Sequence, residues 1–152
     1  MNQPMPLLLV VEDNNEDYTT LLRVFRKLAF SQRVERCANA EECFDYLYAL
    51  KKYQERNETA PPLLLLLDLN LPGKDGHAIL RQIKAVSSLR HIPIVIITTS
   101  TDPRDIQTCY MEGANSYLIK TVDYVVYEQT IRHFLDYWFH AVRLPFSAEV
   151  AL

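Results

Sequence analysis

Three kinds of chemically useful side chain stand at the ends of short apolar runs in this sequence. An acidic pair, Glu12 and Asp13, follows LLLVV, and Asp68 follows a run of five leucines. Thr98 ends IVIIT, and Lys120 follows SYLI. Carboxylates that meet repel one another unless a cation neutralises them, and Mg²⁺ prefers such oxygen ligands. A lysine and a hydroxyl beside that cation suit a phosphoryl group, whose transfer depends on positioning and charge neutralisation.

These side chains need elements that bring them together, and the sequence predicts an alternation of strands and helices. Short apolar runs predict strands, whereas apolar residues recurring with the helical period predict amphipathic helices. The predicted strands are Leu7–Val11, Arg33–Cys37, the leucine run from Leu63, Ile94–Thr98 and Ser116–Ile119. The predicted helices are Glu16–Ala29, Ala40 to about Tyr53, His77–Val86, Asp102 to Gly113, and Tyr124–Ala141.

This alternation predicts a doubly wound α/β domain, with a parallel sheet and helices on both of its faces. In such sheets ligands bind at the carboxyl ends of the strands, so we expect the three acids to meet Thr98 and Lys120 at one edge. The cluster has no histidine base and no Ser-His-Asp order, which argues against acyl transfer. The chain has only three glycines and no glycine-rich phosphate loop, which argues against nucleotide binding.

The composition is that of an ordinary soluble domain. The chain has 152 residues, of which 49% are hydrophobic and 23% charged, enough for a single core. A net charge of −3 gives no electrostatic case for binding nucleic acid or an anionic membrane. The N-terminus lacks the pattern of a signal peptide or membrane span, so we expect a cytoplasmic protein. The three cysteines lack C-x-x-C spacing and are expected to be reduced thiols without a zinc site.

Taken together, these motifs resemble the receiver domains of two-component response regulators over roughly residues 5–140. The shared features are the acidic pair Glu12-Asp13, D-L-N-L-P-G-K-D-G from Asp68 to Gly76, Thr98, G-A-N-S-Y from Gly113 to Tyr117, and Lys120. The spacing agrees as well, since Thr98 lies 30 residues after Asp68 (98 − 68) and Lys120 lies 22 residues after Thr98 (120 − 98). The combination is far more specific than any one of its motifs.

The resemblance implies a flavodoxin-like receiver fold with strand order 2-1-3-4-5 and chemistry centred on Asp68. Asp68 would be the phospho-acceptor, forming a 4-aspartylphosphate by attack on a phosphohistidine of a sensor histidine kinase. Asp13 and Asp68 would bind Mg²⁺ directly, with the backbone carbonyl of Asn70 as a further ligand and Glu12 acting through water. Because this is Mg²⁺-dependent self-phosphorylation, we expect a phosphorelay protein and not a conventional enzyme.

The resemblance also assigns roles to three residues beside the acceptor. Lys120 would pair with the phosphoryl oxygens, and Thr98 would bond to the phosphoryl group and move toward it. Tyr117 would reposition as the coupled switch aromatic, in a population shift driven by phosphate contacts. The family usually has Lys-Pro after its fifth strand, with a cis bond before the proline, whereas this chain has Lys120-Thr121. A cis bond before a non-proline residue costs about 2.5–4 kcal/mol, so we expect a trans bond here.

A narrower resemblance points to the small response regulators paired with cyanobacterial phytochromes. It rests on D-L-N-L-P, T-T-S and G-A-N-S-Y, on Tyr137-Trp138, and on an extended second helix near Tyr53. It implies a phytochrome, a bilin-binding photoreceptor histidine kinase, as the phosphodonor. We expect the receiver domain to span residues 5–142, followed by a tail at 143–152 and no output domain.

Two alternatives stay open at this point. A pseudo-receiver would use the same fold as a constitutive protein-interaction module without phosphoryl transfer. The intact acids and lysine argue against it, while Thr121 leaves it some room. A Mg²⁺-dependent phosphohydrolase with an aspartyl nucleophile would need a second acid for acid–base catalysis and a cap over its substrate. The chain has no insertion long enough to form such a cap.

Other polar residues are interpreted as structural, whereas the last helix is interpreted as part of a partner surface. Asp17 is interpreted as a first-turn helix acid, Asp75 as a helix cap, and the four histidines as surface or packing residues. The aromatic residues of the last helix surround much of its circumference, more than one buried stripe requires. They are Phe134, Tyr137, Trp138 and Phe139. We therefore expect a homodimer through the helix after Asp102, the strand at 116–119 and the last helix.

Overall fold

The computed structural model describes residues 7–54, 64–71 and 76–145 of the chain. The strands form one parallel sheet in the order β2-β1-β3-β4-β5. They are β1 (Leu7–Val11), β2 (Arg33–Cys37), β3 (Leu64–Asp68), β4 (Ile94–Thr98) and β5 (Ser116–Ile119). The predicted doubly wound fold and strand order are confirmed, and four of the five strands have the predicted bounds.

The two central strands, β3 and β4, are buried along their whole length. Successive residues of a strand point to opposite faces of the sheet. In β3, Leu64 and Leu66 join the core on one face, whereas Leu65 and Leu67 join the core on the other. Such strands have no solvent-facing side, so a polar side chain finds partners only where the strand ends.

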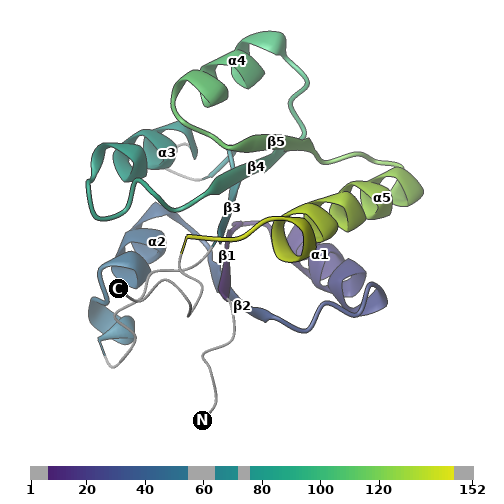
Figure 1. The fold of residues 1–152 in the computed structure, drawn as a ribbon, viewed down its shortest axis with the longest axis horizontal. Helices are drawn as coiled ribbons and strands as arrows, with labels where there is room; N and C mark the ends of the chain where they lie inside the picture. Colours follow the sequence, from purple (N-terminus) through teal and green to yellow (C-terminus); the bar gives the residue numbers. More distant parts are fainter. Residues whose placement is uncertain (1–6, 55–63, 72–75, 146–152) are drawn as a thin grey trace.

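Helices cover both faces of the sheet (Figure 1). They are α1 (Asn15–Lys27), α2 (Ala40–Leu47), α3 (Gly76–Ala85), α4 (Pro103–Met111) and α5 (Tyr124–Leu135). Leu21 of α1 and Ile131 of α5 are buried in the core of one face. Cys43 of α2, Ile79 of α3 and Cys109 of α4 are buried in the core of the other. With both faces covered, the carboxyl edge of the sheet is the place where polar groups from several strands can meet.

Local caps start and end the helices that follow β1 and β4. The Asn14 side chain accepts a hydrogen bond from the backbone N–H of Asp17 at 2.9 Å and caps α1. Asp102 caps α4 and Pro103 occupies its first turn, as predicted. Gly113 follows α4 with φ of 107°, a backbone conformation that favours glycine, also as predicted.

The second helix is shorter than predicted. α2 ends at Leu47, and a separate 3₁₀ turn, η1, follows at Lys51–Tyr53. Ala49 and Lys51 have φ values of 53° and 51°, and residues in this left-handed region end a helix. The extension to Tyr53 was expected because the apolar pattern continues across the break, where Tyr53 still packs against the core.

The last helix changes type near its end. α5 ends at Leu135, and a π-helical segment, η2 (Asp136–Ala141), continues it. In η2 Phe139 packs against Phe30, with ring centroids 4.9 Å apart. Of the four aromatic residues named in the prediction, Tyr137 alone is exposed, at 54%, because the others are buried in or packed against the core that α1 and α5 share. The wider turn of a π-helix changes which side chains face inward.

The remaining predictions concern sites away from the sheet edge. The predicted turn at Pro72-Gly73, the cap at Asp75 and the end of the tail from residue 146 lie outside the described residues. Across the part of the chain that the structure describes, no helix is long and apolar enough to cross a membrane. Cys37, Cys43 and Cys109 are buried and form no disulfide with one another.

Candidate functional site

Among the described residues, buried polar side chains occur in one place, the carboxyl edge of the sheet. Glu12 and Asp68 are each 4% exposed, and Thr98 is fully buried. Glu12 directly follows β1, whereas Asp68 and Thr98 are the last residues of β3 and β4. The predicted convergence of strand ends is therefore found. Burying polar groups costs free energy, and groups buried in this way cluster at functional sites.

Three carboxylates meet at this edge. Oxygen atoms of Glu12, Asp13 and Asp68 lie within 4.8 Å of one another, with Asp13 on the solvent side. Burial, together with a hydrogen bond to Asp68, raises the pKa of Glu12 to about 7, although Lys120 acts in the opposite direction. A hard divalent cation would relieve this repulsion, and carboxylate oxygens at such spacing fit the few protein ligands that Mg²⁺ takes. The donor set therefore fits Mg²⁺.

The Lys120 ammonium lies among the acids and binds three carboxylates. Its Nζ atom donates to Glu12 Oε1 at 2.5 Å, to Asp17 Oδ2 at 2.9 Å and to Asp68 Oδ2 at 3.0 Å. Burial alone would lower the pKa of Lys120, but the hydrogen bonds to Glu12 and Asp17 and the charge of Asp68 outweigh it and raise the pKa. Lys120 is therefore held as a cation beside Asp68.

Sequence reasoning missed the contact of Asp17 with Lys120. Asp17 was interpreted as a first-turn helix acid and not as a ligand, and it does lie in the first turn of α1. The same turn starts directly after the acidic pair that follows β1, and this brings the Asp17 side chain to the ammonium. The position one helical turn beyond Asp13 was the available signal.

The backbone around Asp68 is fixed on both sides. The N–H of Asn70 donates to Asp68 Oδ1 at 3.0 Å, which orients the carboxylate. Gly76, the first residue of α3, donates its N–H to the carbonyl of Leu69 at 2.8 Å. A Cβ atom at Gly76 would lie 2.4 Å from the backbone oxygen of Asp68, so only glycine fits here without a shift. Asn70 is exposed at the site edge.

Thr98 and Tyr117 lie along the loop that leaves β4. The N–H of Ser100 donates to Thr98 Oγ1 at 3.4 Å. The Tyr117 hydroxyl, from β5, donates to the carbonyl of Ser100 at 2.9 Å, and the ring is partly buried. Both residues predicted to form the switch thus contact the same loop residue.

The backbone on the other side of Lys120 follows the expectation from the missing proline. The bond between Lys120 and Thr121 is trans. The N–H of Lys120 donates to the carbonyl of Thr98 at 2.7 Å, which continues the pairing of β4 and β5 by one step. The lysine is thus placed by the sheet itself as well as by its acidic partners.

With this geometry in place, comparison with known proteins identifies the family. A family model described as the response regulator receiver domain matches residues 8–132. The chain belongs to this family. Two relatives cover almost the whole chain. The probable methanogenesis regulatory protein FilR2 of Methanothrix harundinacea is 37% identical over 139 residues, 91% of this chain and 87% of that protein. Response regulator Rcp1 of Synechocystis is 30% identical over 145 residues, 95% of this chain and 96% of that protein.

Solved structures of response regulators share the fold of this receiver. RPA3017, a response regulator in red light signaling of R. palustris, superposes with a TM-score of 0.87 at 29% identity, over 94% of this chain and 100% of that one. The phosphorylated cyanobacterial phytochrome response regulator RcpA superposes with a TM-score of 0.84 at 29% identity, over 93% of this chain and 99% of that one. The Mn²⁺-bound form of Rcp1 superposes with a TM-score of 0.83 at 28% identity, over 93% of this chain and 99% of that one. The predicted similarity to phytochrome response regulators is confirmed.

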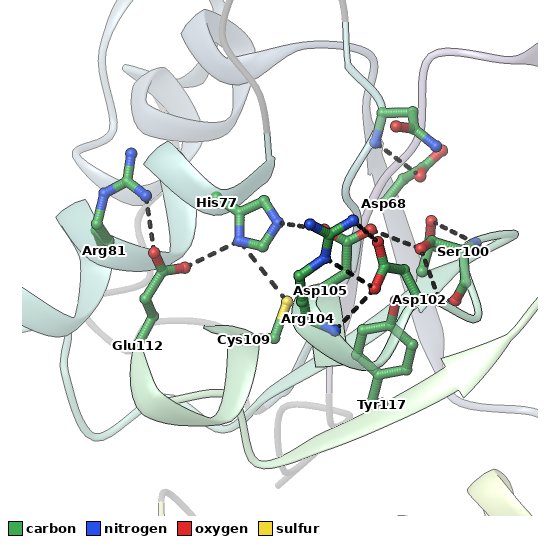
Figure 2. A network of polar contacts seen from close by, with 12 residues as sticks. Asp68, His77, Arg81, Ser100, Asp102, Arg104, Asp105, Cys109, Glu112 and Tyr117 are labelled. Carbon is green, nitrogen blue, oxygen red and sulfur yellow. Dashed lines mark hydrogen bonds and ion pairs between the residues drawn. The ribbon is translucent and has the colours of Figure 1, made fainter. Parts of the chain in front are cut away.

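A second polar network in this receiver joins α3 to α4 and reaches the switch loop (Figure 2). His77 of α3 contacts Glu112, at the end of α4, through Nδ1 at 3.0 Å, and its Nε2 lies 3.9 Å from Asp105. Asp105 accepts a hydrogen bond from the Ser100 hydroxyl at 2.5 Å, and Arg81 binds Glu112 at 2.8 Å. His77 was expected to be a surface or packing residue, and spacing along the sequence carried no signal for these contacts.

Proposed function

We propose that this receiver accepts a phosphoryl group on Asp68 from a phosphohistidine of a sensor histidine kinase, with Mg²⁺ as cofactor. The observation that carries the proposal is the position of Asp68, buried at the end of β3 with one oxygen on Lys120 and within 4.8 Å of two further carboxylates. A buried carboxylate that shares a lysine with other acids is the arrangement that phosphoryl transfer needs, because charge must be neutralised on the acceptor and on the transferred group.

Each residue has a defined task in this transfer. An Asp68 carboxylate oxygen forms the new P–O bond while the P–N bond of the phosphohistidine breaks. The released imidazole nitrogen keeps the electron pair and takes a proton from solvent. Lys120 donates to the phosphoryl oxygens from its place beside Asp68. Glu12, Asp13 and Asp68, with the carbonyl of Asn70, would hold Mg²⁺, which neutralises negative charge between acceptor and phosphoryl group when it is bound.

The switch that follows phosphorylation would use the loop after β4. Thr98 is fully buried at the end of β4. β4 pairs with β3, the strand that ends in the acceptor Asp68. A bond from its hydroxyl to a phosphoryl oxygen would draw the loop toward Asp68. The Tyr117 hydroxyl holds the carbonyl of Ser100 in this loop, so movement of the loop requires Tyr117 to follow or release it. Phosphorylation would thus favour one of two arrangements of Thr98 and Tyr117.

The phosphodonor proposed is a phytochrome. The support is the similarity to Rcp1 and to the phytochrome response regulator RcpA, and to RPA3017 of red light signaling. The similarity to FilR2, a probable methanogenesis regulatory protein, makes a kinase that is not a photoreceptor the alternative donor. Incubation with a purified phytochrome kinase and with a non-photoreceptor kinase would distinguish the two, since phosphoryl transfer within seconds is expected from the cognate donor only.

We further propose a homodimer through α4, β5 and α5. β5 is an edge strand of the sheet, and apolar side chains are exposed on the two helices that flank it and on the loop into α5. They are Tyr110, Met111, Val122, Tyr124, Val125 and Val126. An unpaired edge beside exposed apolar residues favours association. Sedimentation at tens of micromolar, with and without a phosphoryl analogue, tests this, and a monomer under both conditions would contradict it.

One experiment tests the proposed chemistry against its alternatives. The protein is incubated with acetyl phosphate and Mg²⁺, and its intact mass is measured beside that of Asp68→Asn. A Mg²⁺-dependent gain of one phosphoryl group that the variant lacks is the expected result. No gain would instead indicate a pseudo-receiver that acts as a constitutive interaction module. Rapid turnover of many phosphoesters would indicate a phosphohydrolase.

A further inference from the structure

The Lys120 ammonium uses its three N–H donors on three carboxylates, and one of these differs from the others. A lysine ammonium has three donors and no acceptor. Glu12 and Asp68 belong to the cluster of acids that fits a divalent cation, and Asp17 does not. A cation and a phosphoryl group that engaged Glu12 and Asp68 would share those carboxylates with new partners. Asp17, which is outside that cluster, would then remain the acidic partner of Lys120.

The backbone that carries Asp17 is fixed at the start of α1. Its N–H donates to the side chain of the cap residue Asn14 at 2.9 Å. The N–H of Asn14 in turn lies 3.3 Å from Glu12 Oε2, so the cap is tied to the acid that follows β1. The Asp17 side chain therefore projects from a point that the sheet and the helix cap determine together. It has no need to move for the lysine to stay in place.

A hollow lies beside Lys120 and Asp17. Its volume is about 130 Å³, and it opens between the start of α1 and the loop after β5. Its lining residues include Asp17, Thr20, Lys120, Val122 and Tyr127. A lysine side chain has four rotatable bonds and considerable rotamer freedom, so space of this size offers the ammonium positions away from Asp68. Asp17 and Lys120 both line this hollow, and the same ammonium that binds Asp17 at 2.9 Å binds Asp68 at 3.0 Å.

We propose that Asp17 is a positioning residue that holds the Lys120 ammonium over Asp68 for phosphoryl transfer. This inference rests on the proposed phosphorylation of Asp68. The Asp17 side chain is 46% exposed, in contrast to 5% for Glu12 and 6% for Asp68. Water screens an exposed charge, so Asp17 repels an incoming phosphoryl group less than a buried acid would, while its hydrogen bond still directs the lysine.

The test compares Asp17→Ala with Glu16→Ala and Asp17→Asn. Glu16 is an exposed acid in the same first turn of α1, so its removal changes the net charge and the helix dipole in the same way without touching the Lys120 contact. Asp17→Asn removes the charge but keeps an oxygen that accepts one hydrogen bond from the lysine. It is expected to restore most of what Asp17→Ala loses, which a general effect on folding would not do.

The first measurement needs no phosphoryl group. Metal-free protein is treated with a small amine-acetylating reagent, and modification of Lys120 is followed by peptide mass spectrometry, with the exposed Lys52 as internal reference. Asp17→Ala is expected to label Lys120 about fivefold faster than wild type, as the loss of one partly exposed ionic hydrogen bond allows. Glu16→Ala is expected to label at the wild-type rate. Equal labelling rates in Asp17→Ala and Glu16→Ala would overturn the proposal.

The second measurement is the rate of phosphorylation by acetyl phosphate at saturating Mg²⁺. Asp17→Ala is expected to react about fivefold more slowly, with an Mg²⁺ Kd by calorimetry within about twofold of wild type, because it loses the directed lysine and no metal ligand. Faster labelling of Lys120 combined with an unchanged phosphorylation rate would overturn the proposal, since the contact between Asp17 and Lys120 would then not serve phosphoryl transfer. If wild type gains no phosphoryl group, the proposed function is wrong, and so is the role of Asp17 in phosphoryl transfer, whatever the labelling of Lys120 shows.

Discussion

Two polar networks in this molecule join carboxylates to a nitrogen group, and they are built in different ways. The Lys120 side chain is 13% exposed and lies among the side chains of Glu12 and Asp68, which are 5% and 6% exposed, at the ends of neighbouring parallel strands. The His77 side chain, on α3, is 19% exposed and lies between Asp105 and Glu112, in the first turn and at the end of α4, and the Asp105 side chain is 43% exposed.

The difference lies in what fixes the partners. At the strand ends, pairing of β1, β3, β4 and β5 sets the separation of the side chains, and water is largely excluded, so charges interact strongly. Between α3 and α4 the partners depend on helix packing and remain partly in water, which weakens each contact. The first network is suited to chemistry at a fixed geometry. The second is suited to linking elements that can shift.

The largest effect is expected for Lys120→Met. It keeps the apolar stem but leaves buried Glu12 and Asp68 without their cation, which costs about 3–5 kcal/mol of unfolding free energy. Urea unfolding without divalent cations measures this loss, and Mg²⁺ is expected to restore part of it. The matched change in the helix network is Arg81→Met, whose arginine is 56% exposed, with an expected loss of at most about 1 kcal/mol. Similar losses for the two variants would remove the contrast.

The next effect concerns pH. Burial and the neighbouring Asp68 raise the pKa of Glu12 from 4.5 to about 7 in the folded protein. Between these values the folded state binds a proton that the unfolded chain has released, so the free energy of unfolding falls as pH rises from about 4.5 to about 7. Without divalent cations the fall amounts to up to about 3 kcal/mol. Glu12→Gln is expected to flatten this dependence in unfolding titrations. If Glu12→Gln showed a pH dependence of unchanged size, the dependence would come from titratable groups other than Glu12.

A smaller effect is expected for Gly76→Ala. The new Cβ would lie 2.4 Å from the Asp68 carbonyl oxygen, so α3 or the acceptor segment must shift, at about 1–3 kcal/mol. Because the displaced atoms belong to Asp68 itself, we expect phosphorylation by acetyl phosphate to slow as well. Thermal unfolding and the rate of mass gain measure the two consequences. Full stability together with the wild-type rate would show that the close approach can be relieved without cost.

The smallest effect is expected for His77→Gln. It removes the contact with Glu112 between partly exposed groups, which is worth about 1 kcal/mol or less. Mg²⁺ binding and the phosphorylation rate are expected to stay within about twofold of wild type, because His77 lies outside the strand-end site. A loss of phosphorylation of tenfold or more would show that the helix network is part of the reactive geometry.

The strand ends were predictable because their signals are local. An apolar run that a polar residue ends abruptly is visible in the sequence, and parallel pairing then sends all such ends to one edge. Asp68, Thr98 and Lys120 were found in this way. The start of α4 at Pro103 was predicted from its local capping side chain, Asp102.

The features that were missed depend on residues far apart in the sequence. The helical period gave no warning that α2 ends at Leu47, since Tyr53 continues its apolar pattern by packing after a break. The turn to π-helix after Leu135 places Phe139 against Phe30, which the period of a regular helix does not predict.

By itself, the sequence determined the α/β alternation, the five-stranded parallel sheet and the identity of the acids, hydroxyl and lysine at its carboxyl edge, because each of these is written in short apolar runs and the residues that end them. Only the tertiary structure decided which carboxylates Lys120 binds, since Asp17 and Lys120 are brought together across a gap of 103 residues. The same holds for the link from His77 to Glu112. Spacing along a chain reports one element at a time, whereas a contact between side chains depends on how two elements pack.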